Sequence, residues 1–328
     1  MAVTSQIDLA EGSLLRGQRE QFPLVRWGRS IARFAQHKPL AAFGGVIVLV
    51  MFVAALGASR IAPYGYDVRD YHSLLANPSF SHLLGTDDVG RDIFSRIVYG
   101  ARVSIIVGFG TVIISTLVAG AVGVSAGYFG GWVDLVAQRI VDVWLSFPPL
   151  LLLIVFAAVF GTPTTPKLFF DHTPLKMILD PAEIRTAQII LYLGLVLSGG
   201  SSRVFRSAVI SIRNNQYIEA ARAIGANHVR VIFHYILPNV MPVMLVIATV
   251  QLGLAILIEA SLSFLSFGIP PPVPAWGSML SGNATQFVNR APILAVWPGL
   301  AISLAVFGFN MLGDGLRDVL DPRLRGSQ

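Results

Sequence analysis

The chain has 328 residues, of which 54% are hydrophobic and 13% are charged; its formal net charge is +6 and it contains no cysteine. A soluble globular chain carries about 25% charged residues, so the composition indicates a membrane protein. The lack of cysteine excludes disulfide frameworks and thiolate metal sites. The basic residues are spread over separate loops, which is a poor match to a nucleic-acid-binding face.

Residues 1–38 are polar and basic, and they lack the apolar core that a signal peptide needs. They predict a cytoplasmic N-terminal tail. A span needs about 20 mostly apolar residues, and a helix satisfies its own backbone in lipid. Such runs occur at about 39–59, 101–126, 133–160, 186–202, 240–262 and 292–313. The sequence therefore predicts an all-α polytopic membrane protein with six transmembrane helices, followed by a C-terminal tail over 314–328.

Orientation follows from lysine and arginine, which cytoplasmic segments retain. These residues concentrate in the N-terminal tail, in the loop 203–239 and in the C-terminal tail; examples are Arg16, Arg26, Arg206, Arg222, Arg230, Arg317 and Arg323. With six spans, the three segments lie on the same side of the membrane. We therefore expect both termini and the loop 203–239 to be cytoplasmic.

The loop 203–239 contains a charged, helix-forming stretch between two apolar spans. Its apolar residues recur at helical spacing and predict a narrow stripe with small residues at its centre, formed by Tyr217, Ala220, Ala221 and Ile224. Gly225 is expected to end this helix in a left-handed conformation. A second helical stretch follows, and Pro238 marks the start of the fifth span. The stripe is typical both of a docking helix and of an amphipathic helix on the membrane surface.

The fifth predicted span contains one amide and one acidic side chain. Gln251 and Glu259 lie eight residues apart and therefore on nearly the same helical face. Polar groups at membrane depth predict either the lining of a transport pathway or a contact with a partner subunit. For Glu259 the alternative is an acid near the outer end of the span that reaches water.

Other features of the spans predict packing. Gly123 and Gly127 lie one turn apart and favour close helix contact. Pro148 and Pro149 predict a kink in the third span. The charged residues at the start of that span are expected to form an interfacial ion-pair set of Asp134, Arg139 and Asp142.

A motif in the loop 203–239 carries a resemblance to a known family. It consists of Glu219, Ala220, Ala221 and Arg222, then Gly225, and later Leu237 and Pro238. This order resembles the EAA loop of ABC importer permeases, the segment that docks into a groove on the ATPase subunit. The resemblance implies that the loop 203–239 is an ATPase-coupling loop. Tyr235 stands where the family pattern usually has isoleucine, a change that leaves the backbone direction of a docking helix unaltered.

Four further segments resemble the same family and occur in the same order. They are LLGTDDVGRDIFSRIVYGARVS (83–104), GYFGGWVDLVAQRIVDVWLSFPPLLL (127–152), IEASLSFLSFGIPPPVPAWGSML (258–280) and NMLGDGLRDVLDPR (310–323). Together they resemble permeases of the dipeptide, oligopeptide and nickel importers, and among these the shorter, C-type subunit. The resemblance implies a type I importer fold over 39–313 and a B-type partner permease.

The resemblance also implies other partners. Two ATP-binding subunits would hydrolyse ATP with Mg²⁺, and an external solute-binding protein would deliver the cargo to a permease in the inner cell membrane. The chain itself is expected to be non-catalytic and to hold no cofactor or metal, because its lysines, Lys38, Lys167 and Lys176, lie outside any P-loop pattern. Charges before the second span are expected to contact the binding protein; they are Asp87, Asp88, Arg91 and Asp92.

Peptides are the expected cargo, with nickel chelates, glutathione and oligosaccharides as alternatives, because the binding protein largely selects the solute. The rival class is an ion-driven secondary transporter, which has no need of a docking loop. An intramembrane serine protease is a weak reading, since Ser198 lacks the Gly-x-Ser-Gly context and the histidines fall outside the predicted spans. Two segments depart from the family pattern. Residues 161–185 are a longer connection than usual, predicted to be a loose insertion, an external lid or a contact for the binding protein. Residues 199–202 replace an expected Trp-Pro-type pair.

Overall fold

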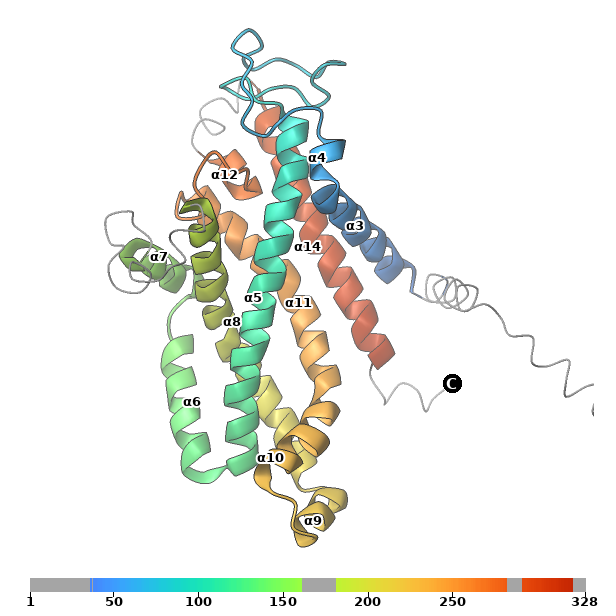
Figure 1. Cartoon of the computed structure of the whole chain (residues 1–328), viewed down its shortest axis with the longest axis vertical. Helices are drawn as coiled ribbons and strands as arrows, with labels where there is room; N and C mark the ends of the chain where they lie inside the picture. The colour runs from blue at the N-terminus through green and yellow to red at the C-terminus, as the bar shows by residue number, and fades with distance from the viewer. Residues whose placement is uncertain (1–35, 37, 161–180, 282–290, 321–328) are drawn as a thin grey trace, which may run out of the picture.

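A computed structural model of the chain describes residue 36 and residues 38–160, 181–281 and 291–320. Five of its helices are long and apolar enough to cross a membrane: α3 (Pro39–Leu56), α5 (Ile93–Phe129), α8 (Pro181–Arg213), α11 (Leu237–Phe264) and α14 (Ile293–Leu320). Figure 1 shows them as one elongated bundle with α5 and α11 at its centre. The all-α membrane fold predicted from the apolar runs is confirmed.

The predicted third span is a bent pair of helices. α6 (Gly131–Leu145) and α7 (Pro149–Phe160) meet at an angle of 86°, so the chain has five candidate spans, or six if the pair counts as one. Proline lacks the N–H that would continue a helix and clashes with the preceding turn. Pro148 and Pro149 therefore explain the break, and the predicted kink is confirmed.

Several helices run beyond the apolar stretches that predicted them. α5 has 37 residues and is about 55 Å long at 1.5 Å per residue, whereas the hydrocarbon core is about 30 Å thick. α8 continues to Arg213 and α14 to Leu320, so the first part of the predicted loop 203–239 and of the predicted C-terminal tail is helical. Apolar residues mark only the part of a helix that meets lipid, and polar turns extend it on either side.

α5 and α8 pack against each other along two glycines of α5. A Cβ atom at Gly123 would lie 2.5 Å from the carbonyl oxygen of Ser202, and one at Gly127 would lie 2.8 Å from Cβ of Val209. In lipid the hydrophobic effect does not drive helices together, so small residues that permit close backbone approach supply much of the packing energy. The predicted role of both glycines in helix packing is confirmed.

Ion pairs join α6 to α8. Arg206 of α8 donates two hydrogen bonds of 2.5 Å each to the carboxylate of Asp134, and Arg203 of α8 donates to Asp142. The predicted pair of Arg139 with Asp142 is looser, at 3.7 Å, and exposed. The predicted ion-pair set is therefore correct in its acids, but their main partners are arginines of another helix that the sequence did not place nearby.

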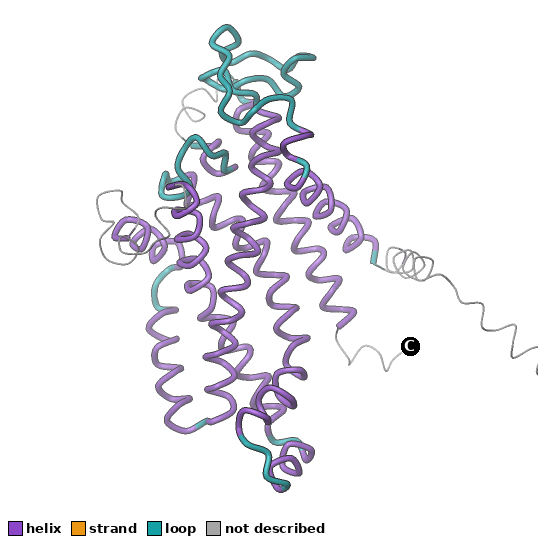
Figure 2. The backbone as a smooth tube through the Cα atoms, in the orientation of Figure 1, coloured by secondary structure: helices purple, strands orange, loops and turns teal. Residues whose placement is uncertain are grey.

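The loops gather at the two ends of the bundle (Figure 2). At one end, residues 62–92 follow the short helix α4 (Ala58–Ile61) and form a lobe that we call the outer cap. α12 (Trp276–Leu280) lies near this end, and the indole N–H of Trp276 donates to the carbonyl of Ile97 on α5 at 3.0 Å. At the opposite end lies α9 (Gln216–Ala223), so the two predicted contact regions are separated by the length of the bundle (Figure 1).

Candidate functional site

α9 is a helix of eight residues that ends as the sequence predicted. Gly225 has φ +86°, and its N–H donates to the carbonyl of Arg222 at 2.9 Å. The N–H of Ala226 donates to the carbonyl of Ala221 at 3.0 Å. These bonds satisfy the last carbonyls of the helix, which is the usual reason for a left-handed glycine at this position.

The face that α9 turns to the bundle differs from the predicted stripe. Ile218 and Ala221 are buried, whereas the other members of the stripe, Tyr217, Ala220 and Ile224, are exposed. Ile218, which sequence reasoning missed, is the anchor: it packs in a buried cluster with α5, α8 and α11. Its spacing of three from Ala221 was the signal for this second, inward face.

The outward side of α9 and of the segment after it carries exposed apolar residues. Ile224 is 84% exposed, and Val229 and Phe233, which follow the Gly225 turn, are 63% and 60% exposed. Glu219 and Arg222 are exposed on the same short helix. We call Tyr217, Ala220, Ile224, Val229 and Phe233 the apolar stripe of this end.

A short helical joint connects α9 to the fifth span. α10 (His228–Arg230) begins at Asn227, whose side chain accepts the N–H of Arg230 at 2.8 Å, and the π-helix η2 (Val231–Ile236) follows. α11 starts at Leu237, with Pro238 exposed at its first turn, as predicted. Because η2 runs directly into α11, Pro238 lies at the change from π-helix to α-helix. Tyr235, the departure from the family pattern, is partly buried in the joint.

At the other end of the bundle, two of the predicted contact residues hold the outer cap together. Asp87 is 8% exposed and accepts hydrogen bonds from the N–H groups of Val89 and Arg91, at 3.0 and 2.8 Å, and from Nε of Arg91 at 2.7 Å. Nε of Arg96 lies 3.8 Å from the same carboxylate. A buried carboxylate needs such partners to remain ionised. In this structure Asp87 is thus an internal support, which corrects its prediction as a surface contact.

Asp92 is an internal support too. It is 3% exposed, caps the start of α5 by accepting the N–H of Ser95 at 2.8 Å, and lies 3.0 Å from Nδ1 of His82. His82 is also buried and stacks on Tyr64. Side-chain caps of this kind satisfy the free N–H groups of the first helical turn. The sequence shows an Asp two residues after a glycine, which is a signal for a helix start that we read as a partner contact.

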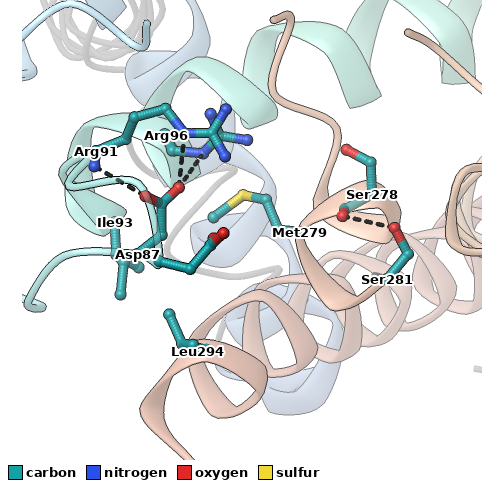
Figure 3. Close-up of a pocket in the computed structure, with 9 residues that line it drawn as sticks. Asp87, Arg91, Ile93, Arg96, Ser278, Met279, Ser281 and Leu294 are labelled. Carbon is teal, nitrogen blue, oxygen red and sulfur yellow. Dashed lines mark hydrogen bonds and ion pairs between the residues drawn. The ribbon is translucent and has the colours of Figure 1, made fainter. Parts of the chain in front are cut away.

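A polar pocket of about 120 Å³ lies between the outer cap, α12 and the start of α14 (Figure 3). It brings together Asp87, Asp88 and Arg91 of the predicted contact set with Arg96, which sequence reasoning missed. Asp92 is not among its lining residues, and the others are Ile93, Ser278, Met279, Ser281 and Leu294. Acids and bases are balanced in this pocket, so it has no strong preference for an ion of either sign.

Asp87→Asn is expected to loosen the outer cap. The substitution leaves the buried Arg96 and its neighbour Arg91 without their shared carboxylate, and removing one partner of a buried charge pair costs about 3 kcal/mol. Limited proteolysis of the cap in detergent measures the effect. Asp67→Asn is the control, because Asp67 is exposed in the same lobe. Equal proteolysis of both variants and the unaltered protein would contradict the structural role.

Gln251 ties three helices together in the middle of the bundle. Its amide group accepts from Oγ of Ser115 on α5 at 3.1 Å and donates to Oγ of Ser201 and the carbonyl of Leu197 on α8, at 2.7 and 3.2 Å. The side chain is buried among helices of this chain. It is 8% exposed, and its predicted role in lining a pathway or contacting a partner permease stays a prediction. Ser201 belongs to the segment that departs from the family pattern, and it makes one of these bonds.

Gln251→Leu is expected to destabilise the helix bundle by about 1–2 kcal/mol, because interhelical hydrogen bonds in membranes average about 0.6 kcal/mol each. The measurement is thermal unfolding of the purified protein in detergent. Val250→Leu, at the exposed neighbouring position, is expected to leave the midpoint unchanged. A midpoint for Gln251→Leu equal to that of Val250→Leu would show that the three bonds contribute nothing.

Glu259 is also enclosed. It is 1% exposed, and Oγ of Ser263, one turn further along α11, donates to its Oε1 at 2.6 Å. The expectation that this acid reaches water is therefore wrong in this structure. The α12 segment covers it: Gly277 packs so closely that a Cβ there would lie 2.0 Å from the carbonyl oxygen of Ala260. Periodicity placed Glu259 on its helix but gave no sign of this covering segment.

Comparison with known proteins decides the family. Residues 119–326 match the family model described as binding-protein-dependent transport system inner membrane component. This chain belongs to that family of transport permeases. Residues 26–78 of the permease also match the model of the N-terminal transmembrane domain of oligopeptide transport permease C. These matches confirm the C-type resemblance seen in the sequence.

Curated relatives cover nearly the whole permease. The dipeptide transport system permease protein DppC of Alkalihalophilus pseudofirmus is 39% identical over 306 residues, which are 93% of each chain. The glutathione transport system permease protein GsiD of Pectobacterium atrosepticum is 35% identical over 318 residues, 97% of each chain. GsiD of Escherichia coli O1:K1 is 36% identical over 302 residues, 92% of this permease and 91% of the relative. The permease is thus a multi-pass membrane protein of a transport system and belongs to a non-enzymatic family.

Proposed function

We propose that this permease is one of two membrane subunits of an ATP-driven importer that takes up peptides, with glutathione included among them. The proposal is supported by full-length similarity to permeases named for dipeptide and glutathione transport. Nickel chelates and oligosaccharides are the alternative cargoes. The observation that supports the importer mechanism is the exposed apolar stripe of α9 and the segment that follows it.

The apolar stripe is proposed to dock an ATP-binding subunit. Ile224 and Phe233 are among the most exposed large apolar side chains at this end of the bundle, at 84% and 60%, and such residues in an exposed cluster favour a protein partner. Glu219, Arg222 and Gly225 belong to the same proposed contact, with Leu237 and Pro238 connecting it to the fifth span. ATP and Mg²⁺ would bind to the partner, whose closure on ATP would push α9 and switch the bundle between inward-facing and outward-facing states.

The end that carries α9 is proposed to lie in the cytoplasm. Its basic residues include Arg206, Arg213, Arg222 and Arg230, which fits the retention of positive charge on that side. Both termini would lie on the same side, and the protein would sit in the inner cell membrane. The outer cap would then face the solute-binding protein, and a B-type permease would complete the passage. Asp88 and Arg91, which line the pocket without being fully buried, are the members of the predicted set best placed for that contact.

Ile224→Arg tests the docking. The importer is purified in mild detergent through a tag on this permease, and the retained ATP-binding chains are measured by mass spectrometry. We expect the new charge to remove most of the retained ATP-binding chains. Phe80→Arg, at a fully exposed position in the outer cap, is the control and is expected to retain them fully. Glu219→Lys, which reverses a charge beside the stripe, is expected to weaken retention in the same direction. Full retention by Ile224→Arg would reject docking at α9.

The cargo is tested separately. Vesicles that contain the purified importer are given a dipeptide or glutathione together with the solute-binding protein, and ATP-dependent uptake is measured. Uptake of either peptide supports the proposal. ATP-independent uptake that follows an ion gradient would instead assign the chain to the secondary transporters.

A further inference from the structure

Tyr128, near the end of α5, contacts residues on both sides of the Gly225 turn. We call the stretch 216–236, which contains this turn, the coupling segment. Its hydroxyl lies 2.9 Å from Nδ1 of His228 on α10. The guanidinium of Arg222 on α9 lies over its ring, 5.2 Å from the ring centroid. The side chain is only 5% exposed. Nothing in the motif that marks α9 refers to this residue, which lies about 100 positions earlier in the chain.

α9 needs external contacts to hold its direction. A helix of eight residues is not stable alone, and α9 buries only Ile218 and Ala221. The buried cluster that contains Ile218 also contains Tyr128. Tyr128 therefore packs beneath α9 and also contacts Arg222 on α9 and His228 after it. Cation–π contacts and buried hydrogen bonds are directional. They therefore hold the orientation of α9 as well as its position.

Chain connectivity links α9 only to α8 before it and to α11 after it. α5 and α6 have no covalent path to α9 except through the whole of α8. Tyr128 adds a direct non-covalent connection beside the packing of Ile218, and α5 continues through Gly130 and Gly131 into α6. α6 is in turn fastened to α8 by Asp134 and Arg206. Tyr128 thus joins the end of α5 to α9 and α10, and α6 and α8 are connected to that end by the turn after α5 and by the Asp134–Arg206 ion pair.

We propose that Tyr128 is a positioning residue that transmits displacement of α9 to the hairpin of α5 and α6. This inference rests on the proposed docking of an ATP-binding subunit at α9. Without the link, a push on α9 would reach α5 and α6 only indirectly, through the packing of Ile218 and through the contacts of α8 with both helices. With it, α5 and α6 move together with α9, so that the bundle switches as a unit and ATP hydrolysis remains tied to transport.

The test is the uptake per ATP hydrolysed by the complete importer in vesicles. Tyr128→Phe keeps the ring beneath Arg222 and removes the bond to His228. A neutral hydrogen bond contributes enough to change such a ratio about fivefold, so we expect a drop of that order with the ATP-binding chains still bound. Tyr99→Phe is the matched control: it makes the same change at the far end of α5, where the hydroxyl has no hydrogen bond in the described structure.

A double-mutant cycle separates the bond from general damage. If the Tyr128–His228 contact carries the effect, His228→Ala lowers the ratio as Tyr128→Phe does, and the double variant is no worse than either single one. Additive losses would overturn the assignment to this contact.

A distance measurement gives a readout that a purely structural role would not change. The chain lacks cysteine, so Ala223→Cys on α9 and Leu135→Cys on α6 introduce the only spin-labelling sites of this chain, and the measurement uses partner subunits whose own cysteines have been replaced. In the otherwise unaltered importer, ATP is expected to move both labelled helices together, so the distribution of distances between the two labels stays narrow. In Tyr128→Phe we expect the distribution of distances between the labels to broaden when ATP is added. Identical distributions in both proteins, or an uptake ratio for Tyr128→Phe equal to that of Tyr99→Phe, would overturn the inference while leaving docking intact. Failure of the docking proposal is recognised separately, by full retention of the ATP-binding chains in Ile224→Arg.

Discussion

Gly225→Pro is expected to reduce ATP-dependent uptake by about tenfold or more, because it removes both features that end α9. Proline holds φ near −65°, whereas Gly225 has φ +86°. It also lacks the N–H that donates to the carbonyl of Arg222. α9 would lose its end and its direction, and with them its proposed contact with the ATP-binding subunit. The measurement is uptake and ATP hydrolysis by the complete importer in vesicles.

A series at Gly225 separates conformation from the lost N–H. Gly225→Val keeps the N–H and adds only strain, since a left-handed residue with a Cβ costs about 1–2 kcal/mol. Gly225→Asn is expected to be milder, because asparagine tolerates this region. A Cβ at this position meets no atom within 4 Å, so steric conflict does not confound the series. Normal stimulation of ATP hydrolysis by cargo in Gly225→Pro would reject the assignment of α9 as the coupling element.

Gly123→Leu is expected to prevent the bundle from forming its native contacts. A Cβ would lie 2.5 Å from the carbonyl oxygen of Ser202 and 3.0 Å from Cβ of Phe205. Backbone atoms cannot move aside as a flexible side chain does, so α5 and α8 must separate. Overpacking alone costs about 1–3 kcal/mol, and the lost helix contact adds to it. The measurement is the yield of monodisperse protein after extraction, with thermal unfolding of whatever remains.

Gly200→Ala is the control for this prediction. It adds a Cβ to a glycine of α8, where no atom lies within 4 Å, and it is expected to behave like the unaltered protein. A yield and midpoint for Gly123→Leu that match those of Gly200→Ala would show that the close approach of α5 and α8 is not required for stability.

The apolar runs predicted the membrane helices because lipid imposes a simple rule on them. A span must be apolar for about 20 residues and must satisfy its own backbone. That rule predicted α3, α5, α8, α11 and α14, and the two prolines predicted the break after α6. It did not find the bend angle, nor the polar turns by which α5 and α8 extend past the lipid. Residues 161–180, most of the predicted insertion, and the bulk of both predicted tails lie outside the described residues.

The candidate site was predicted unevenly for a similar reason. The end of α9 at Gly225 and the start of α11 at Leu237 follow from local backbone chemistry, which the sequence shows directly. The burial of Ile218 depends on residues of α5 and α8 that lie far away in the chain. Asp87 and Asp92 are charged and close to a turn, so their composition suggested a surface; only their contacts with Arg91 and His82 show that they are internal.

The sequence by itself determined the membrane class, the approximate spans, the family motif and the turn that ends α9, because each depends on composition or on neighbours within a few residues. Only the tertiary structure decided which polar groups face inward. Gln251 bonds to α5 and α8, Glu259 is covered by α12, and Tyr128 lies under the coupling segment, and none of these contacts has a local signature. A side chain's periodicity gives its face on a helix, but the neighbour on that face is set by how separate helices pack.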